Sequence, residues 1–175
     1  MTNFRNIIRF QSIISSEQNE TINKSILFHG KQRQQLCFVE ELTELLKELM
    51  HNDSNRVLCT DETLSEIADV VVYVEDIKIL YGFHNSQFNI QTPYALLGDA
   101  ITDMLIAISH YERNRIDETT YKGMILKLYM SIEEYLEVRY GPDETIWEKM
   151  NQLLDEKFEK FKSQIDKEMK NVRED

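Results

Sequence analysis

The sequence is poor in glycine, proline and cysteine. Its 175 residues include only 5 Gly and 2 Pro, a composition that disfavours a turn-rich β fold and favours long helices. The two cysteines, Cys37 and Cys59, form no CxxC pair, so we expect free core thiols and no disulfide framework. A chain of this length fits one domain, which buries about 70% of the surface of its unfolded state.

Basic charge and long apolar runs are also scarce. The net charge is −11 at pH 7, which argues against nucleic-acid binding because phosphate recognition depends on clustered Lys and Arg. The longest apolar run, residues 67–74, is interrupted and is far shorter than the roughly 20 residues that span a bilayer. Arg5 and Arg9 break the N-terminal stretch before a signal-peptide core develops. We therefore predict a cytoplasmic protein that binds neither membranes nor nucleic acid.

Apolar residues recur at helical spacing in residues 36–49 and again in residues 64–77. Turn and capping residues then mark where helices begin and end, and the first 30 residues add one helix and a loop. The sequence thus predicts an all-α bundle of about five to six helices. The expected helices run from near Lys31 to the turn at 51–55, from 61–62 to Tyr81-Gly82, from Pro93 to about Tyr111, from about Thr119 to Tyr140-Gly141, and from Pro142-Asp143 into the charged tail.

The chain carries a candidate internal repeat. A shift of 59 residues lays residues 36–82 on residues 95–141 without a gap and gives nine identities in 47 positions, among them both Tyr-Gly pairs. The alternative is that two amphipathic helical hairpins align this well by pattern alone. In this register the second copy lacks most of the acidic residues of the first: Glu40 and Glu44 meet Asp99 and Asp103, whereas Glu41, Glu66 and Asp69 meet Ala100, Ile125 and Leu128.

Two acidic pairs stand out in the first copy. Glu41 and Glu44 are three residues apart, as are Glu66 and Asp69, so each pair projects from one helix face. Two such helices packed antiparallel would bring four carboxylates together, and these need a cation to stay ionised at close range. Ligation by oxygen alone suits Mg²⁺, Mn²⁺ or Ca²⁺. The alternative for any one of these residues is a carboxylate on an amphipathic helix that faces water.

The acidic residues form the sequences EELTE at 40–44 and EIAD at 66–69. Together they resemble the EExxE…ExxD motif of the all-α nucleoside triphosphate pyrophosphohydrolases, the MazG-like and dimeric dUTPase superfamily. The flanks GKQRQ at 30–34 and VVVY at 70–73 agree, so the resemblance covers roughly residues 30–82. It implies tandem MazG-like hairpins in a single domain of residues 1–175, with a catalytic hairpin at 30–82, a degenerate hairpin at 92–141 and a C-terminal helix at 142–175.

The resemblance also implies a chemistry. Glu41, Glu44, Glu66 and Asp69 would ligate Mg²⁺, with Mn²⁺ as a substitute, and the metal would bind the triphosphate and position an attacking water. Glu40 or Glu44 would take the proton, although Glu40 can equally be a solvent-facing residue. The products would be a nucleoside monophosphate and pyrophosphate, formed from a dNTP or a noncanonical NTP. Fused hairpins of this kind also imply a homodimer.

Further residues follow from the flanks of the motifs. Gln34, Tyr73 and Lys157 are expected to contact the substrate; Lys157 opens a KFEKF stretch that resembles the closing Lys-Phe-x-x-Arg of many MazG-type domains, with Asp155 in place of the usual preceding Asn. Asp76, on a face similar to that of Asp69, is interpreted as solvent-facing. The base preference stays open, with aromatic candidates at Trp147, Tyr73, Tyr94, Tyr111, Phe28 and Phe38.

Two other classes of protein share features with this sequence. A di-iron carboxylate bundle would use the ExxH pair Glu48 and His51, but such a site needs a second ExxH, and no other histidine follows a Glu by three residues. A catalytically inactive helical protein that binds a nucleotide or another protein is the second alternative, and metal-dependent turnover distinguishes it from an enzyme. The first hairpin keeps every motif carboxylate, which favours the enzyme.

Overall fold

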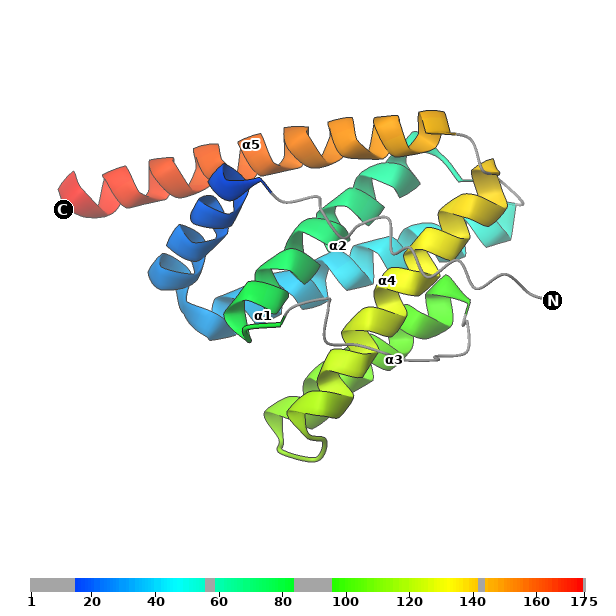
Figure 1. The fold of residues 1–175 in the computed structure, drawn as a ribbon, viewed down its shortest axis with the longest axis horizontal. Helices are drawn as coiled ribbons and strands as arrows, with labels where there is room; N and C mark the ends of the chain where they lie inside the picture. Colours follow the sequence, from blue (N-terminus) through cyan, green and yellow to red (C-terminus); the bar gives the residue numbers. More distant parts are fainter. Residues whose placement is uncertain (1–14, 56–58, 84–95, 142–143, 175) are drawn as a thin grey trace.

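The structure is a computed structural model that describes residues 15–55, 59–83, 96–141 and 144–174. All regular structure in these ranges is α-helical, which confirms the predicted all-α bundle (Figure 1). None of these helices combines the length and apolar character that crossing a membrane requires. The helices are α1 (Ser16–Asn55), α2 (Asp61–Leu80), α3 (Leu97–Glu112), α4 (Glu118–Tyr140) and α5 (Glu144–Glu174).

A sharp kink at Gly30 divides α1 into two parts. Gly30 has φ 77° and ψ 165°, a backbone conformation that strains any residue with a Cβ, and it interrupts the helix. The first part, residues 16–29, is called the arm below, and it is the additional N-terminal helix expected from the sequence. The second part of α1 begins after the kink, in agreement with the helix start predicted near Lys31.

The remaining helix starts have local causes. Thr60 and Thr63 form a reciprocal capping box at the start of α2, and the Asp117 side chain accepts a hydrogen bond of 2.7 Å from the Thr120 amide at the start of α4. The helix predicted from Pro93 begins at Leu97 instead, because Leu96 is extended, with φ −57° and ψ 141°. Pro93 and Pro142-Asp143 lie outside the described residues.

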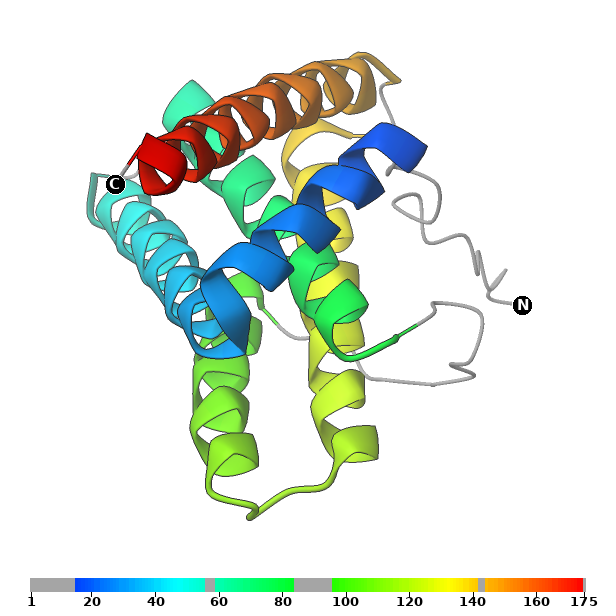
Figure 2. The same cartoon turned by 90° about the vertical axis from the view of Figure 1, so that its left-hand side faces the viewer.

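The helices form two antiparallel hairpins and a long C-terminal helix. In the first hairpin, Asn52 donates to Thr63 (2.8 Å) at one end, and Gln35 donates to the Tyr81 hydroxyl (2.6 Å) at the other. In the second hairpin, the rings of Tyr111 and Tyr121 stack with centroids 4.4 Å apart where α3 and α4 meet. Helix α5 packs along α2 and also contacts α1, where the arm turns back toward it (Figures 1 and 2).

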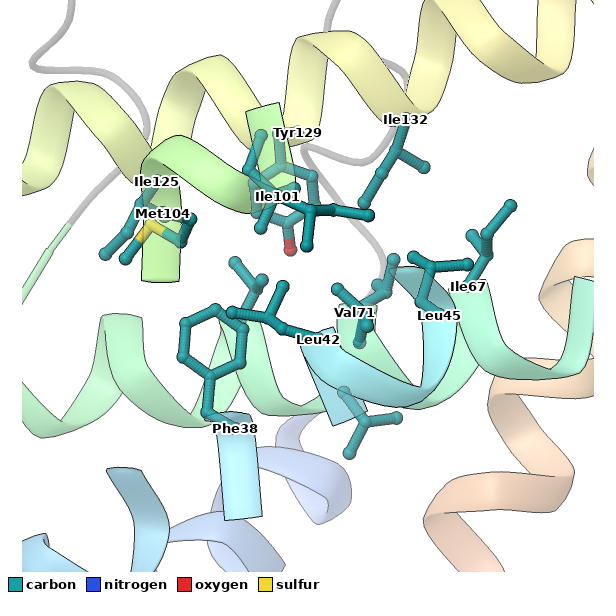
Figure 3. Close-up of a cluster of buried hydrophobic side chains, with 14 of the residues drawn as sticks. Phe38, Leu42, Leu45, Ile67, Val71, Ile101, Met104, Ile125, Tyr129 and Ile132 are labelled. Atoms are coloured by element: carbon teal, nitrogen blue, oxygen red, sulfur yellow. The ribbon is translucent and has the colours of Figure 1, made fainter. Parts of the chain in front are cut away.

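The hydrophobic core lies between the two hairpins (Figure 3). All four hairpin helices contribute to it. The positions that helical periodicity predicted for α2 are buried, and so are Leu42 and Leu45 of α1, whereas Leu36 at the start of the predicted α1 set is exposed. In the second hairpin, Ala100, Ile125 and Leu128 stand where the repeat alignment places Glu41, Glu66 and Asp69, and all three are buried. The labelled core residues are Phe38, Leu42, Leu45, Ile67, Val71, Ile101, Met104, Ile125, Tyr129 and Ile132.

A buried polar group joins α2 to α4. The Lys78 ammonium lies 2.6 Å from the Glu75 carboxylate, and the Tyr129 hydroxyl donates to the same carboxylate. Each of the three residues is less than 9% exposed, so the pair and the hydroxyl satisfy one another away from water. No motif or local pattern of the sequence predicts this group.

Candidate metal centre

Three carboxylates converge where α1 and α2 face each other. Glu41 on α1 and Glu66 and Asp69 on α2 each place one oxygen within 4.8 Å of the other two. All three side chains are partly buried. The antiparallel packing of the first hairpin therefore brings together three of the four residues that were expected to bind a metal.

The fourth expected ligand, Glu44, lies beside this group. Its side chain is exposed and is not one of the three that converge. Its charge nevertheless raises the pKa of both Glu41 and Glu66, so it adds to the negative potential at the site. Glu40, the candidate proton acceptor, is also exposed.

The converging carboxylates are electrostatically strained. Burial, reinforced by the charges of Asp69, Glu44 and Glu66, raises the pKa of Glu41 to about 7. Burial and the neighbouring acids also raise the pKa of Glu66, and its Oε2 atom is buried with no hydrogen-bond partner in the described part of the chain. A set of carboxylate oxygens with a buried, unpartnered member and an excess of negative charge fits a hard divalent cation such as Mg²⁺.

One basic side chain reaches the acidic group. The Lys157 ammonium, from α5, pairs with Oδ2 of Asp69, and the two side chains are 19% and 25% exposed. Its positive charge opposes the upward shift in the pKa of Glu41 and of Glu66. Lys157 thus lies at the acidic cluster and partly neutralises it, whereas the sequence predicted it only as a substrate-binding residue.

The other two expected substrate residues lie farther along the same hairpin. Tyr73 follows Asp69 by one turn; its hydroxyl interacts with the Cys37 thiol, and its ring meets the edge of Phe161 at 6.0 Å between centroids. Burial raises the pKa of Tyr73 far above the physiological range, so the hydroxyl stays neutral.

Gln34 is buried, and its amide donates to Ser25 Oγ in the arm at 2.6 Å.

The interpretation of Asp76 as a solvent-facing residue is wrong. The side chain is 0% exposed, and neither carboxylate oxygen has a hydrogen-bond partner in the described residues. Burial alone raises the pKa of Asp76 to about 7. The reason is that α2 packs against α1, α5 and α4, so even its more polar side is covered. The sequence holds no local signal of this burial, because Asp76 lies between Glu75 and Ile77 and is followed by Lys78.

The remaining candidates have structural roles. Glu48 accepts a hydrogen bond of 3.1 Å from the Thr60 hydroxyl, so it supports the start of α2. Cys37 and Cys59 are free thiols and are partly buried. Among the aromatic candidates, Phe38 is a core residue, Tyr111 stacks on Tyr121, Phe28 meets His29 edge-on and Trp147 packs against the core, while Tyr94 lies outside the described residues.

Comparisons with protein-family models, with curated proteins and with solved structures found no match. The candidate metal centre therefore rests on its own geometry. That geometry consists of three carboxylates on an antiparallel helical hairpin, a lysine from α5 and a tyrosine one turn away.

Proposed function

We propose that the protein hydrolyses a nucleoside triphosphate, a dNTP or a noncanonical NTP, to the monophosphate and pyrophosphate in a Mg²⁺-dependent reaction. The observation that carries this proposal is the convergence of Glu41, Glu66 and Asp69 within 4.8 Å. These residues belong to the two motifs whose order and spacing resemble those of the all-α pyrophosphohydrolases. An all-α hairpin is also the framework that such motifs require.

Each residue has a role that follows from its position. Glu41, Glu66 and Asp69 supply oxygen ligands, and Glu44, whose charge acts on the same site, completes the set. Mg²⁺, when bound, neutralises phosphate charge and lowers the pKa of a coordinated water. The exposed carboxylates of Glu40 and Glu44 are free to accept the proton that the water loses.

Lys157 has two successive partners in this proposal. Without substrate its ammonium neutralises Asp69. If Asp69 held a metal, the ammonium would be available to the negatively charged phosphates. The lysine would thus offset the charge of Asp69 without substrate and that of the phosphates with it.

The same proposal includes a homodimer. Two fused hairpins, one with the acidic residues and one without, resemble half of a four-hairpin assembly. Several large apolar side chains are exposed and can take part in association, among them Leu36 on α1 (58% exposed) and Ile106 on α3 (50% exposed).

The experiment that tests the function is release of pyrophosphate from a panel of NTPs and dNTPs with and without Mg²⁺. We expect Mg²⁺-dependent release by the wild type and at least an approximately 100-fold loss in Asp69→Asn. Asp99→Asn is the matched control, because Asp99 is an exposed aspartate on the hairpin that lacks the cluster, and it should keep full activity.

The alternative of an inactive nucleotide-binding protein gives a different result. Such a protein would show a higher melting temperature with Mg²⁺ and nucleotide but no pyrophosphate from any member of the panel. That outcome would contradict the proposed hydrolysis.

A further inference from the structure

Asp76 has a side chain whose burial the proposed catalytic chemistry does not explain. The carboxylate is 0% exposed, and both oxygens lack a hydrogen-bond partner in the described residues. A buried carboxylate without donors is costly, and native proteins rarely keep one unless a ligand or another function uses it. Its substitution by an apolar residue would suit the surrounding core better, so its presence requires a reason.

The position of Asp76 relates it to the candidate metal centre. Glu66, Asp69, Tyr73 and Asp76 follow one another at intervals of three, four and three residues, which places them on one face of α2. Asp76 lies seven helical positions after Asp69, a rise of roughly 10 Å. This length is comparable to the separation between the phosphates of a nucleotide and the far edge of its base.

The neighbouring helices continue along the same line. Glu41 on α1 lies at Asp69, and Cys37 lies at Tyr73, so the antiparallel register brings Gln34 to the level of Asp76. Residues of α5 follow the same direction, because Lys157 pairs with Asp69 and Phe161 contacts Tyr73. Along α2 the hairpin thus has three successive regions: the carboxylates at Asp69 that suit a metal and phosphates, the aromatic residues at Tyr73, and the buried polar residue Asp76.

We infer that Asp76 binds the base of the triphosphate and selects guanine, an inference that rests on the proposed function. An aspartate carboxylate has two acceptor oxygens and no donor when ionised. Guanine presents two adjacent donors on its Watson–Crick edge, N1–H and the 2-amino group, so that each carboxylate oxygen of Asp76 receives one hydrogen bond. Adenine, cytosine and uracil do not offer two adjacent N–H donors on that edge.

The arm packs against this end of the hairpin. Ser25 in the arm bonds with Gln34, and Ile22 of the arm is fully buried. Its polar links to α5 include Gln18 with Asp155 (3.1 Å) and His29 with Glu168 (3.2 Å). Such partly exposed links contribute little stability, and the arm joins the rest of α1 at Gly30. Entry of a base requires the arm to move about this residue and to expose Ile22.

The test compares steady-state pyrophosphate release from dGTP, dITP, dATP, dCTP and dUTP by the full chain. The base of dITP keeps N1–H but lacks the 2-amino group, so we expect kcat/KM for dGTP to exceed that for dITP by about tenfold or more in the wild type. In Asp76→Asn the amide keeps only one acceptor, and the ratio of dGTP to dITP should fall to near one. Asp99→Asn is the control that should keep the wild-type ratio.

The outcomes separate this inference from the proposed function. If the wild type releases pyrophosphate and Asp76→Asn keeps the same selectivity with an intact melting curve, the base assignment is overturned while the hydrolysis stands. If the wild type releases none, the proposed hydrolysis fails, and melting with Mg²⁺ and α,β-imido dGTP or dITP decides the inference. A larger melting shift with the guanine analogue that is lost in Asp76→Asn supports it, and equal or absent shifts overturn it.

Discussion

Glu41→Gln should stabilise the metal-free protein and weaken its response to Mg²⁺. The pKa of Glu41 is raised from 4.5 to about 7, so the folded state holds the proton more tightly than the unfolded state does. The stability that protonated Glu41 contributes is therefore present below pH 4.5 and is lost as the pH rises through about 7. At 1.36 kcal/mol per pKa unit the loss is about 3 kcal/mol at most, and partial exposure reduces it to about 1–2 kcal/mol.

The assay is thermal unfolding at pH 8 in EDTA and in a Mg²⁺ titration. For a chain of this size, 1–2 kcal/mol corresponds to a melting temperature roughly 2–8 °C higher for metal-free Glu41→Gln than for the wild type. Mg²⁺ at about 100 times its Kd adds about 2.7 kcal/mol to the wild type, whereas the variant has lost a ligand and should gain less. The difference in stability between Glu41→Gln and the wild type that is found in EDTA should therefore become smaller or change sign in Mg²⁺.

The refuting result is equal Mg²⁺ responses in wild type and Glu41→Gln, which would mean that the carboxylates are only a partly buried acidic surface. Asp99→Asn controls for the loss of an acidic residue elsewhere. Asp69 is a poorer probe of the metal-free state, because Lys157 pairs with it and would be left without this partner.

Two further predictions follow from Asp76 and from the proposed assembly. The pKa of Asp76 is raised from 3.8 to about 7, so the stability that protonated Asp76 contributes is present below pH 3.8 and is lost as the pH rises through 7. Asp76→Asn should therefore be more stable than wild type at pH 8 but not at pH 4. The expected difference at pH 8 is about 1–3 kcal/mol in the free energy of unfolding measured with urea. An equal difference in stability between Asp76→Asn and wild type at pH 8 and at pH 4 would contradict the ionisation of Asp76 as its cause. Light scattering at micromolar concentration should give twice the 20.8 kDa mass of one chain, and a single-chain mass would contradict the dimer.

The sequence predicted the helical framework well because that information is local. Periodic apolar residues and capping residues fixed α2 and α4 closely, and the Tyr-Gly pairs marked their ends at Gly82 and Gly141. The convergence of Glu41 with Glu66 and Asp69 was also predictable, since a short connection forces neighbouring helices to pack antiparallel.

The features that escaped prediction depend on distant parts of the chain. Lys157 reaches Asp69 across 88 residues, and Tyr129 reaches Glu75 across 54. Periodicity identifies the face on which Asp76 lies, but whether that face is covered depends on where α4 and α5 pack. A single sequence offers no local signal for such packing.

The kink at Gly30 also gives the two parts of α1 different places in the order of folding. The bonds between the arm and α5 join residues 137 and 145 positions apart, whereas the first hairpin closes over a short loop. Contacts between distant residues carry a larger loop-closure entropy, so they form late and open first. The backbone amides of the arm should therefore exchange hydrogen with solvent well before those of the second part of α1, although both belong to one helical segment.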